Sequence, residues 1–285
     1  MKRRLRPALL VLALLGALAD YYYHVESAVR VETVQLASAA LGKTLPYRVL
    51  LPPGYGLFTS RATRYPVLYL LHGWGGHYDS WLANTSLADY ASEHRLIIVT
   101  PEGENGWYTD GAGRYESYIL QELIPDVDGR FRTIGARRGR GVAGYSMGGY
   151  GALKFGFRHP EAFALAASTS GALDAAARTD DDSIMQTFGE AGTPTRADND
   201  LPRLAREFPD ARRGALPYLY LDCGLDDPWL AANRDFAATL AGRRVAHEYR
   251  QLPGAHVWPY WDRQVREILR VASEMLAAPE DGARR

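Results

Sequence analysis

Short apolar runs alternate along the chain with stretches in which apolar residues recur every three or four positions. Apolar runs of this length are typical of strands in a buried sheet, and the wider spacing is typical of helices packed against one. The runs predict strands at residues 31–38, 45–51, 65–71, 96–100, 141–145, 164–168, 218–221 and 245–252. The wider spacing predicts helices at residues 84–94, 115–131, 147–158, 230–240 and 261–276.

This alternation predicts one α/β domain with a mostly parallel central sheet and helices on both faces. The first two strands alternate apolar and polar residues, and we expect them to pair antiparallel. We place the domain at residues 29–278 and a disordered tail at residues 279–285. Ligands of such sheets bind beyond the carboxyl ends of the strands, so we look for chemistry just after each strand.

Residues 174–210 interrupt the alternation. The segment is rich in Asp, Arg, Thr, Pro and Gly, and only residues 201–208 have a weak helical pattern. We expect a solvated excursion from the sheet. A small cap over a ligand pocket is the functional alternative.

The first 28 residues have the pattern of a targeting segment. A basic cluster at residues 2–6 precedes an apolar stretch over 7–19, and Ala17-Leu18-Ala19 fits a signal peptidase site. The apolar stretch is shorter than the roughly 20 residues that a membrane span takes. We therefore expect an exported protein, periplasmic or secreted, in which residues 1–28 are a signal peptide or an uncleaved anchor. A buried helix of the domain is the alternative.

Composition limits the classes of function. The 285 residues carry 33 basic and 33 acidic side chains, so net charge gives no argument for a nucleic-acid partner. The single cysteine, Cys223, cannot form an intrachain disulfide, and no Cys/His cluster has the spacing of a zinc site. We expect no metal and no organic cofactor, and we expect membrane contact only through an uncleaved N-terminal anchor.

The strongest chemical motif is the G-x-S-x-G pentapeptide at residues 144–148, with Ser146 at its centre. An apolar strand precedes it and a helical pattern follows it. This strand–turn–helix context is what a nucleophile elbow requires, because the flanking glycines leave room for a tight turn that lifts the serine hydroxyl out of the sheet. A plain glycine-rich turn is the structural alternative.

A serine hydroxyl becomes a good nucleophile only when a base takes its proton. In this kind of fold the acid and then the histidine follow the serine along the chain. Asp226 and Asp227 both follow the strand at residues 218–221, and spacing alone does not choose between them. His256 lies on a loop between the last predicted strand and the last predicted helix, which makes it the expected base.

The run His72-Gly73-Trp74-Gly75-Gly76 follows the third predicted strand. Such a loop directs backbone N–H groups into the site, and the residue after the nucleophile supplies a second donor. We assign the oxyanion hole to the N–H groups of Trp74 and Met147. Aromatic residues are frequent near the predicted strand ends and would suit a flat apolar or sugar-bearing substrate.

Six stretches, in order along the chain, resemble the esterase D family of α/β-hydrolases. They are LHGWGGHYDSW, PEGENGWYTD, YESYILQELIPDVDGRFRT, GYSMGGYGALKFGFRHPEAFA, LDCGLDDPWLAANRDFAATL and PGAHVWPYWDRQ. That family includes S-formylglutathione hydrolases, feruloyl and acetyl-xylan esterases, and mycolyltransferases. The resemblance implies an α/β-hydrolase fold with Ser146 as nucleophile, Asp227 as acid and His256 as base. Many relatives have Asp or Ser where this chain has Val257, which weakens any close match of substrate.

The implied activity is hydrolysis of carboxylic esters, with acyl esters of carbohydrates or other small molecules as substrates. An acyltransferase that passes the acyl group to a sugar or lipid alcohol is the alternative, and a catalytically inactive binding module is an alternative of a different class. The resemblance indicates that the loop with Trp107 and Tyr108 faces the substrate. The full set of candidate substrate-binding residues is His72, Trp107, Tyr108, Tyr145, Trp229 and Trp258.

Overall fold

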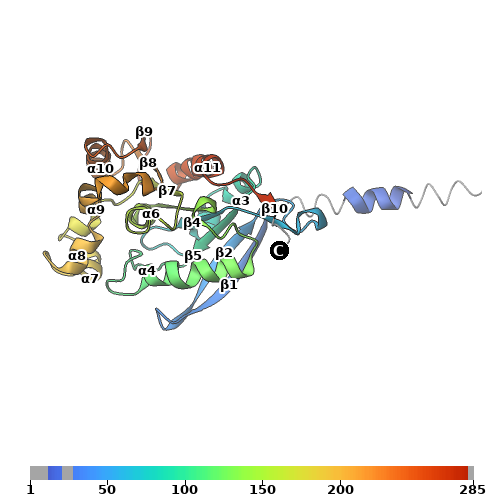
Figure 1. Ribbon diagram of the computed structural model, residues 1–285, viewed down its shortest axis with the longest axis horizontal. Coiled ribbons are helices and arrows are strands. Elements are labelled where there is room, and N and C mark those ends of the chain that lie inside the picture. The colour runs from blue at the N-terminus through green and yellow to red at the C-terminus, as the bar shows by residue number, and fades with distance from the viewer. Residues whose placement is uncertain (1–11, 21–27, 282–285) are drawn as a thin grey trace, which may run out of the picture.

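The computed structural model describes residues 12–20 and 28–281. Eight strands form one sheet in the order β1-β2-β5-β4-β6-β7-β8-β9 (Figure 1). All eight correspond to predicted runs to within a few residues. They are β1 (Arg30–Ser38), β2 (Lys43–Leu51), β4 (Val67–Leu71), β5 (Ile97–Pro101), β6 (Arg140–Tyr145), β7 (Leu165–Thr169), β8 (Tyr218–Gly224) and β9 (His247–Leu252).

The sheet is mixed at one edge and parallel elsewhere. β1 pairs antiparallel with β2, and β2 pairs antiparallel with β5. The strands from β5 through β4, β6, β7 and β8 to β9 are parallel. The predicted α/β fold with a mostly parallel sheet is confirmed, and the turns after β4, β6, β8 and β9 meet at one edge.

Helices cover both faces of the sheet because alternate strand residues point to opposite sides. Tyr69 and Val99 pack in one apolar cluster, while Leu70 and Ile98 pack in the other. The first cluster includes residues of η2 (Tyr118–Leu123), α5 (Ile124–Arg130), α6 (Met147–Arg158) and α10 (Leu230–Gly242). The second includes residues of α2 (Ser80–Asn84), α3 (Leu87–Ala91) and α11 (Trp258–Met275).

Two predicted helices differ in detail. The helix predicted at residues 84–94 is instead α2 and α3, separated at Thr85 and Ser86. The hydroxyl of Thr85 donates to the carbonyl of Trp81, and the N–H of Ser86 donates to Asp262 at 2.7 Å, so side chains replace the helical bonds there. The second, predicted at 115–131, begins with α4 (Tyr115–Ser117) and has π-helical geometry over η2, just before Pro125, which lacks an N–H.

The segment at residues 174–210 is a helical cap, so the prediction of a solvated excursion is wrong. It contains η4 (Ala175–Ala177), α7 (Asp182–Phe188), α8 (Pro194–Asn199) and α9 (Leu201–Glu207). Ile184, Phe188, Leu201 and Ala205 are buried in the same core cluster as α6. The buried guanidinium of Arg196 donates to the carbonyls of residues 176, 178 and 189, so it joins the cap helices to one another.

Polar contacts anchor the cap on α6. The hydroxyl of Tyr150 donates to the carbonyl of Asn199 at 2.6 Å, and Lys154 reaches the Asn199 side chain at 3.1 Å. Lys154 is fully buried; its ammonium also contacts Glu116 at 2.6 Å and the carbonyl of Tyr108 at 2.7 Å. Removing one partner of a buried ion pair typically costs about 3–5 kcal/mol of stability. This cluster therefore ties the cap, α6 and the loop after β5 into one body.

The ordered chain extends past the predicted domain boundary. β10 (Glu280–Asp281) pairs with β3 (Thr63–Arg64), and Arg138 donates to the Glu280 carboxylate at 2.7 and 2.9 Å. The expected disorder from residue 279 is therefore wrong for these two residues, and the remainder of the predicted tail, 282–285, lies outside the described residues. Short 3-10 turns complete the element set: η1 (Phe58–Ser60), η3 (Arg137–Gly139) and η5 (Asp210–Ala215).

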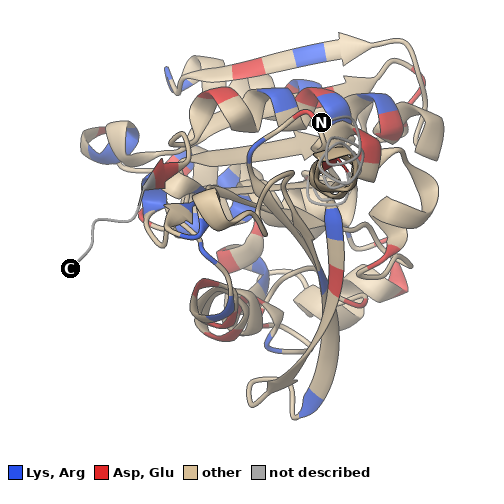
Figure 2. Ribbon diagram, turned by 90° about the vertical axis from the view of Figure 1, so that its right-hand side faces the viewer, with Lys and Arg blue, Asp and Glu red and all other residues tan. Residues whose placement is uncertain are grey.

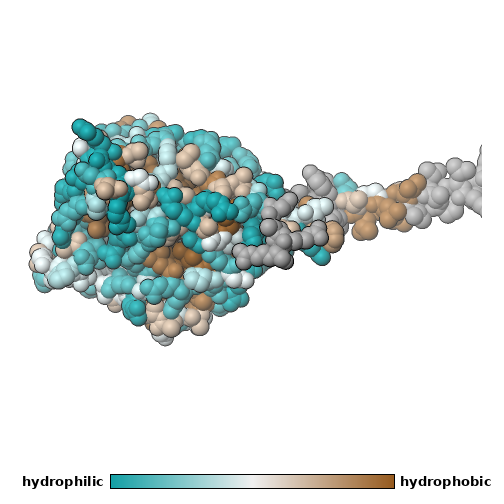
Figure 3. Space-filling model, in the orientation of Figure 1, coloured by the Kyte–Doolittle hydropathy of each residue, from teal (hydrophilic) through white to brown (hydrophobic). Residues whose placement is uncertain are grey.

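Much of the predicted targeting segment, residues 1–11 and 21–27, lies outside the described residues. Residues 12–20 form a helix whose leucine side chains are exposed, visible as the brown segment in Figure 3. Among the helices in the described ranges, none is long and apolar enough to cross a bilayer. In the ribbon of Figure 2, basic and acidic residues alternate along many of the same elements.

Candidate active site

Ser146 lies in the turn between β6 and α6. Its backbone angles are φ 54° and ψ −119°, a region that residues with a side chain rarely adopt. The two glycines of the motif permit the turn, because a Cβ at Gly144 would lie 2.5 Å from the backbone of Gly148, and one at Gly148 would lie 2.5 Å from the carbonyl oxygen of Leu71. The G-x-S-x-G pattern thus forms the strained turn that the sequence predicted.

The structure brings three of the predicted residues together. The Oγ of Ser146 lies 3.0 Å from Nε2 of His256, and Nδ1 of His256 lies 3.0 Å from Oδ2 of Asp227. Asp227 follows β8, and His256 lies between β9 and α11. These distances allow the Ser146 hydroxyl to donate to His256 while the opposite ring N–H donates to the carboxylate.

Asp227, not Asp226, faces the imidazole. The Asp227 side chain is buried, and its second oxygen accepts the N–H of Trp229 at 2.8 Å. Burial alone would raise the pKa of this carboxyl, but hydrogen bonds, that from His256 foremost, hold it below its usual value. Asp226 is exposed and bonds through its backbone N–H to the carbonyl of Gly254. The ambiguity left by spacing is thus resolved by orientation.

The loop after β4 lies beside the nucleophile. Trp74 is 55% exposed and lines the same pocket as Ser146. Met147 is the first residue of α6, so its N–H is among those without a partner within the helix. Trp74 and Met147 thus both lie beside Ser146, and their role as oxyanion donors stays a prediction.

A pocket of about 530 Å³ opens at Ser146. Three tryptophans and the first turn of α7 contribute to its walls, which consist of Trp74, Trp107, Asp180, Asp181, Asp182, Ser183, Ile184 and Trp229. A second hollow of about 280 Å³ shares Trp74 and Ser183 with the first. The cap thus supplies one wall of the pocket, which is the functional alternative that the sequence analysis left open.

The sequence matches the family model described as "Putative esterase" over residues 38–271. The chain belongs to this esterase family. An esterase of Mycobacterium tuberculosis is 32% identical over 252 residues, which cover 78% of this chain and 54% of that protein. The chain therefore spans about half the length of that relative.

Two further proteins resemble this esterase-family chain over most of its length. An acetyl esterase of Caldicellulosiruptor saccharolyticus is 27% identical over 70% of this chain and 79% of the relative. A solved structure of a fluorophosphonate-binding serine hydrolase from Staphylococcus aureus superposes with a TM-score of 0.77 at 26% identity, covering 86% of this chain and 99% of that one. The fold is thus the α/β-hydrolase fold that the resemblance implied.

Of the six candidate substrate-binding residues, two line the pocket of this esterase-family chain. Trp107 is buried and Trp229 is half-buried, and both line the pocket. The guanidinium of Arg178 lies 4.9 Å from the Trp229 ring centre, and it also pairs with Asp180. These contacts fix one wall of the pocket at the start of the cap.

The other four candidates, His72, Tyr108, Tyr145 and Trp258, do not line this pocket, so their prediction as substrate-binding residues gains no support. Tyr145 and Trp258 pack against each other at 4.9 Å between ring centres, together with Trp81 and Trp261. His72 and Tyr108 are fully buried and bond to the loops around the pocket. The Trp261 ring meets His256 edge-on at 4.9 Å, so the aromatic cluster supports the imidazole from behind.

Asp222 is a buried acid that the sequence analysis did not single out. It lies in β8, and its Oδ1 accepts hydroxyl hydrogens from Thr169 at 2.6 Å and Tyr260 at 2.8 Å. Burial raises the pKa of Asp222 to about 7 despite these two bonds. An acidic residue near the end of an otherwise apolar strand was the available signal.

This raised pKa predicts a pH-dependent stability. A carboxyl whose folded-state pKa exceeds its unfolded value of 3.8 stabilises the fold fully below that value and loses this contribution as pH rises toward 7. The side chain of an Asp222→Asn variant cannot ionise. We therefore expect its free energy of unfolding to exceed that of the wild type by about 2–4 kcal/mol at pH 8, with a smaller difference at pH 5. Urea unfolding across this range measures the difference, with the exposed Asp89→Asn as control. A difference independent of pH would contradict the assignment.

Proposed function

We propose that this chain is a serine esterase that hydrolyses carboxylic esters through an acyl-enzyme on Ser146. The arrangement that carries the proposal is the chain of contacts from Ser146 through His256 to the buried Asp227, each at 3.0 Å. Membership of the esterase family and the likeness to a serine hydrolase structure support it.

The mechanism follows from these contacts. His256 Nε2 takes the proton of Ser146 as Oγ attacks the ester carbonyl carbon, and the carbonyl oxygen becomes an oxyanion held by the N–H groups of Trp74 and Met147. The leaving alkoxide then takes that proton from His256, which frees the alcohol. Water repeats the sequence on the acyl-enzyme and releases the carboxylic acid. Asp227 keeps the imidazole in the tautomer with hydrogen on Nδ1 and stabilises its protonated form.

The pocket favours small uncharged esters, acyl esters of carbohydrates among them. Tryptophan rings give flat apolar contact for an acyl group or a sugar face, and carboxylates at the start of α7 can accept hydrogen bonds from alcohol hydroxyls. The same carboxylates disfavour an anionic ester because like charges repel. The acetyl esterase among the relatives is in keeping with a short acyl group.

The direct test is turnover of p-nitrophenyl acetate, with a burst of p-nitrophenol equal to the active enzyme if deacylation is slower than acylation. A panel of acetyl, feruloyl and sugar esters then orders the substrates. The second candidate, acyl transfer, is favoured by the hollow next to Trp74, which has room for an acceptor. Adding glycerol or a sugar decides between them: a transferase forms the new ester at the expense of free acid. If the protein turns over none of these esters, both hypotheses, ester hydrolysis and acyl transfer, are wrong.

We further propose export, with residues 1–28 acting as a signal peptide or anchor. The exposed leucines of the helix at residues 12–20 support this, since a helix belonging to the core would bury them. Mature protein isolated from expressing cells should begin near Asp20 or remain with the membrane fraction. An intact N-terminus in the cytoplasmic fraction would refute export.

A further inference from the structure

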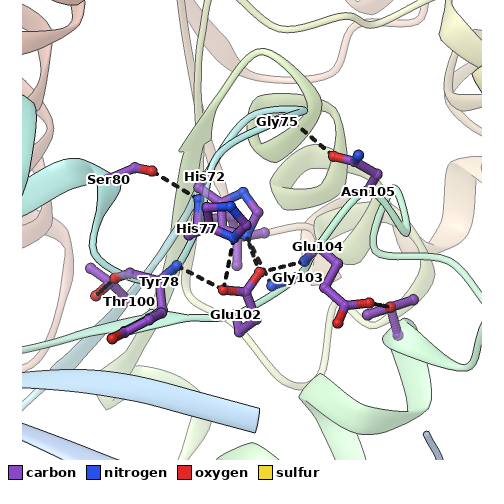
Figure 4. A network of polar contacts seen from close by, with 12 residues as sticks. His72, Gly75, His77, Tyr78, Ser80, Thr100, Glu102, Gly103, Glu104 and Asn105 are labelled. Carbon is purple, nitrogen blue, oxygen red and sulfur yellow. Dashed lines mark hydrogen bonds and ion pairs between the residues drawn. The ribbon is translucent and has the colours of Figure 1, made fainter.

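Two loops approach each other beside Ser146. Residues 72–78 follow β4 and carry Trp74, while residues 102–109 follow β5 and carry Trp107. Both tryptophans line the pocket. Figure 4 shows the polar network between the loops, with the Glu102 carboxylate at its centre. The network contacts neither the hydroxyl of Ser146 nor the imidazole of His256.

Glu102 is 5% exposed, and its carboxylate bonds to both loops. One oxygen accepts the N–H of Tyr78 at 3.2 Å and lies 3.3 Å from the His77 ring, while the other accepts the N–H of Glu104 at 2.7 Å. Burial would raise the pKa of Glu102, but the N–H groups of Glu104 and Tyr78, which donate to the carboxylate, lower it. The carboxylate is therefore ionised near neutral pH, and its charge strengthens both backbone hydrogen bonds.

Three further bonds cross between the loops. The Nε2 of His72 accepts the N–H of Gly103 at 2.9 Å, which leaves Nδ1–H to donate to the carbonyl of Gly73 at 2.8 Å. The hydroxyl of Tyr108 donates to the carbonyl of His72 at 3.0 Å. The Oδ1 of Asn105 accepts the N–H of Gly75 at 2.7 Å. This last bond holds the peptide that immediately follows Trp74.

The backbone of the loop after β5 is strained, because Glu104, Trp107 and Tyr108 have φ between 42° and 52°. In the loop after β4, Gly75 has φ 70°, which glycine adopts without strain. A residue with a side chain persists in this conformation only where its surroundings hold it. Glu102 and Asn105 make bonds that hold these positions, so weakening them should let the loops relax away from the nucleophile.

We propose that Glu102 and Asn105 are positioning residues that keep the N–H of Trp74 directed at the oxyanion. The inference rests on the proposed function, since only a reaction through an oxyanion needs this donor. Neither side chain touches the reacting atoms; they act through the loop. A displacement of about 1 Å in a catalytic group can cost about 100-fold in rate, so small relaxations matter.

The test compares Glu102→Gln with the wild type in kcat, KM and affinity for a boronic acid, which forms an oxyanion-like adduct with the serine. The Gln amide turns an N–H toward one of the two backbone donors, so the loop shifts. We expect kcat to fall about 10- to 100-fold with KM within about threefold, and boronate affinity to fall in parallel with kcat. Asn105→Ala should lower kcat and boronate affinity in the same way as Glu102→Gln. Asn105→Asp keeps the oxygen that accepts the N–H of Gly75, so it should retain most of the wild-type kcat.

Glu122→Gln is the matched control. Glu122 accepts the N–H of Ala40 at 2.8 Å and the hydroxyl of Ser38 at 2.5 Å, and it lines no part of the pocket. We expect it to lower Tm without changing kcat or boronate affinity. If Glu102→Gln and Asn105→Ala likewise change only Tm, the positioning role is wrong.

If Glu102→Gln does not fold, the exposed Asn105 still decides the question. An Asn105→Ala variant with wild-type kcat and boronate affinity overturns the proposal. Failure of the proposed function gives a different result, because the wild type would then lack esterase activity that depends on Ser146.

Discussion

Ser146→Ala should lower ester hydrolysis by about 10⁶-fold in kcat and leave the fold intact. No other group near His256 offers an oxygen at 3.0 Å from Nε2 within the described residues. Losing a nucleophile from a serine triad elsewhere costs about this much, because the remaining groups act only as a unit. Turnover of p-nitrophenyl acetate measures the loss, and circular dichroism checks the fold. Retained turnover would show that another residue is the nucleophile.

Ser146→Gly separates the chemistry from the strain of the turn. Glycine also lacks the hydroxyl, so activity should be lost equally. Glycine tolerates φ 54° and ψ −119° without the strain that any other side chain suffers there. We expect Ser146→Gly to be more stable than Ser146→Ala by about 1 kcal/mol, or about 2–4 °C in Tm. Equal Tm values would show that the turn stores little strain.

Asp227→Asn should lower kcat about 10⁴-fold. The amide of asparagine can present an N–H to Nδ1 of His256, which favours the tautomer with hydrogen on Nε2 and removes the base that Ser146 needs. KM should change little because Asp227 does not line the pocket. Steady-state kinetics on a short-acyl ester gives both parameters.

Asp226→Asn is the matched control for this result. The adjacent carboxylate is exposed, and its backbone, not its side chain, bonds to the loop that carries His256. We expect kcat within about twofold of the wild type, since exposed charges contribute little. If instead Asp226→Asn lost the greater activity, the two residues would exchange roles and His256 would have to turn in solution.

The strands and the nucleophile turn could be predicted because their signals are local. An apolar run is sufficient for a buried strand, and Gly144 and Gly148 mark a turn where a Cβ would collide with backbone. The choice between Asp226 and Asp227 could not be made in this way. Neighbouring side chains leave the backbone in different directions, and which of them meets a histidine 29 residues further on depends on tertiary structure.

The roles of the aromatic residues and the structure of the cap were harder to predict from the sequence, for a different reason. A tryptophan at a strand end serves a core as well as a pocket, so Trp258 and Trp229 could not be told apart by sequence. In the cap, α7 and α9 each bury a pair of apolar residues four positions apart, Ile184 with Phe188 and Leu201 with Ala205. Two apolar residues four positions apart are too few for a helical period to be recognised in a polar sequence, although they are sufficient to pack a short helix against the core.

One wall of the pocket comes from a different stretch of the chain than the reactive groups. Ser146, Asp227 and His256 lie on turns after β6, β8 and β9, whereas Asp180–Ile184 belong to the single insertion between β7 and β8. Changes of length or sequence within that insertion need not move any strand of the sheet. Substrate preference can therefore diverge between related chains while the bond-breaking apparatus is inherited unchanged.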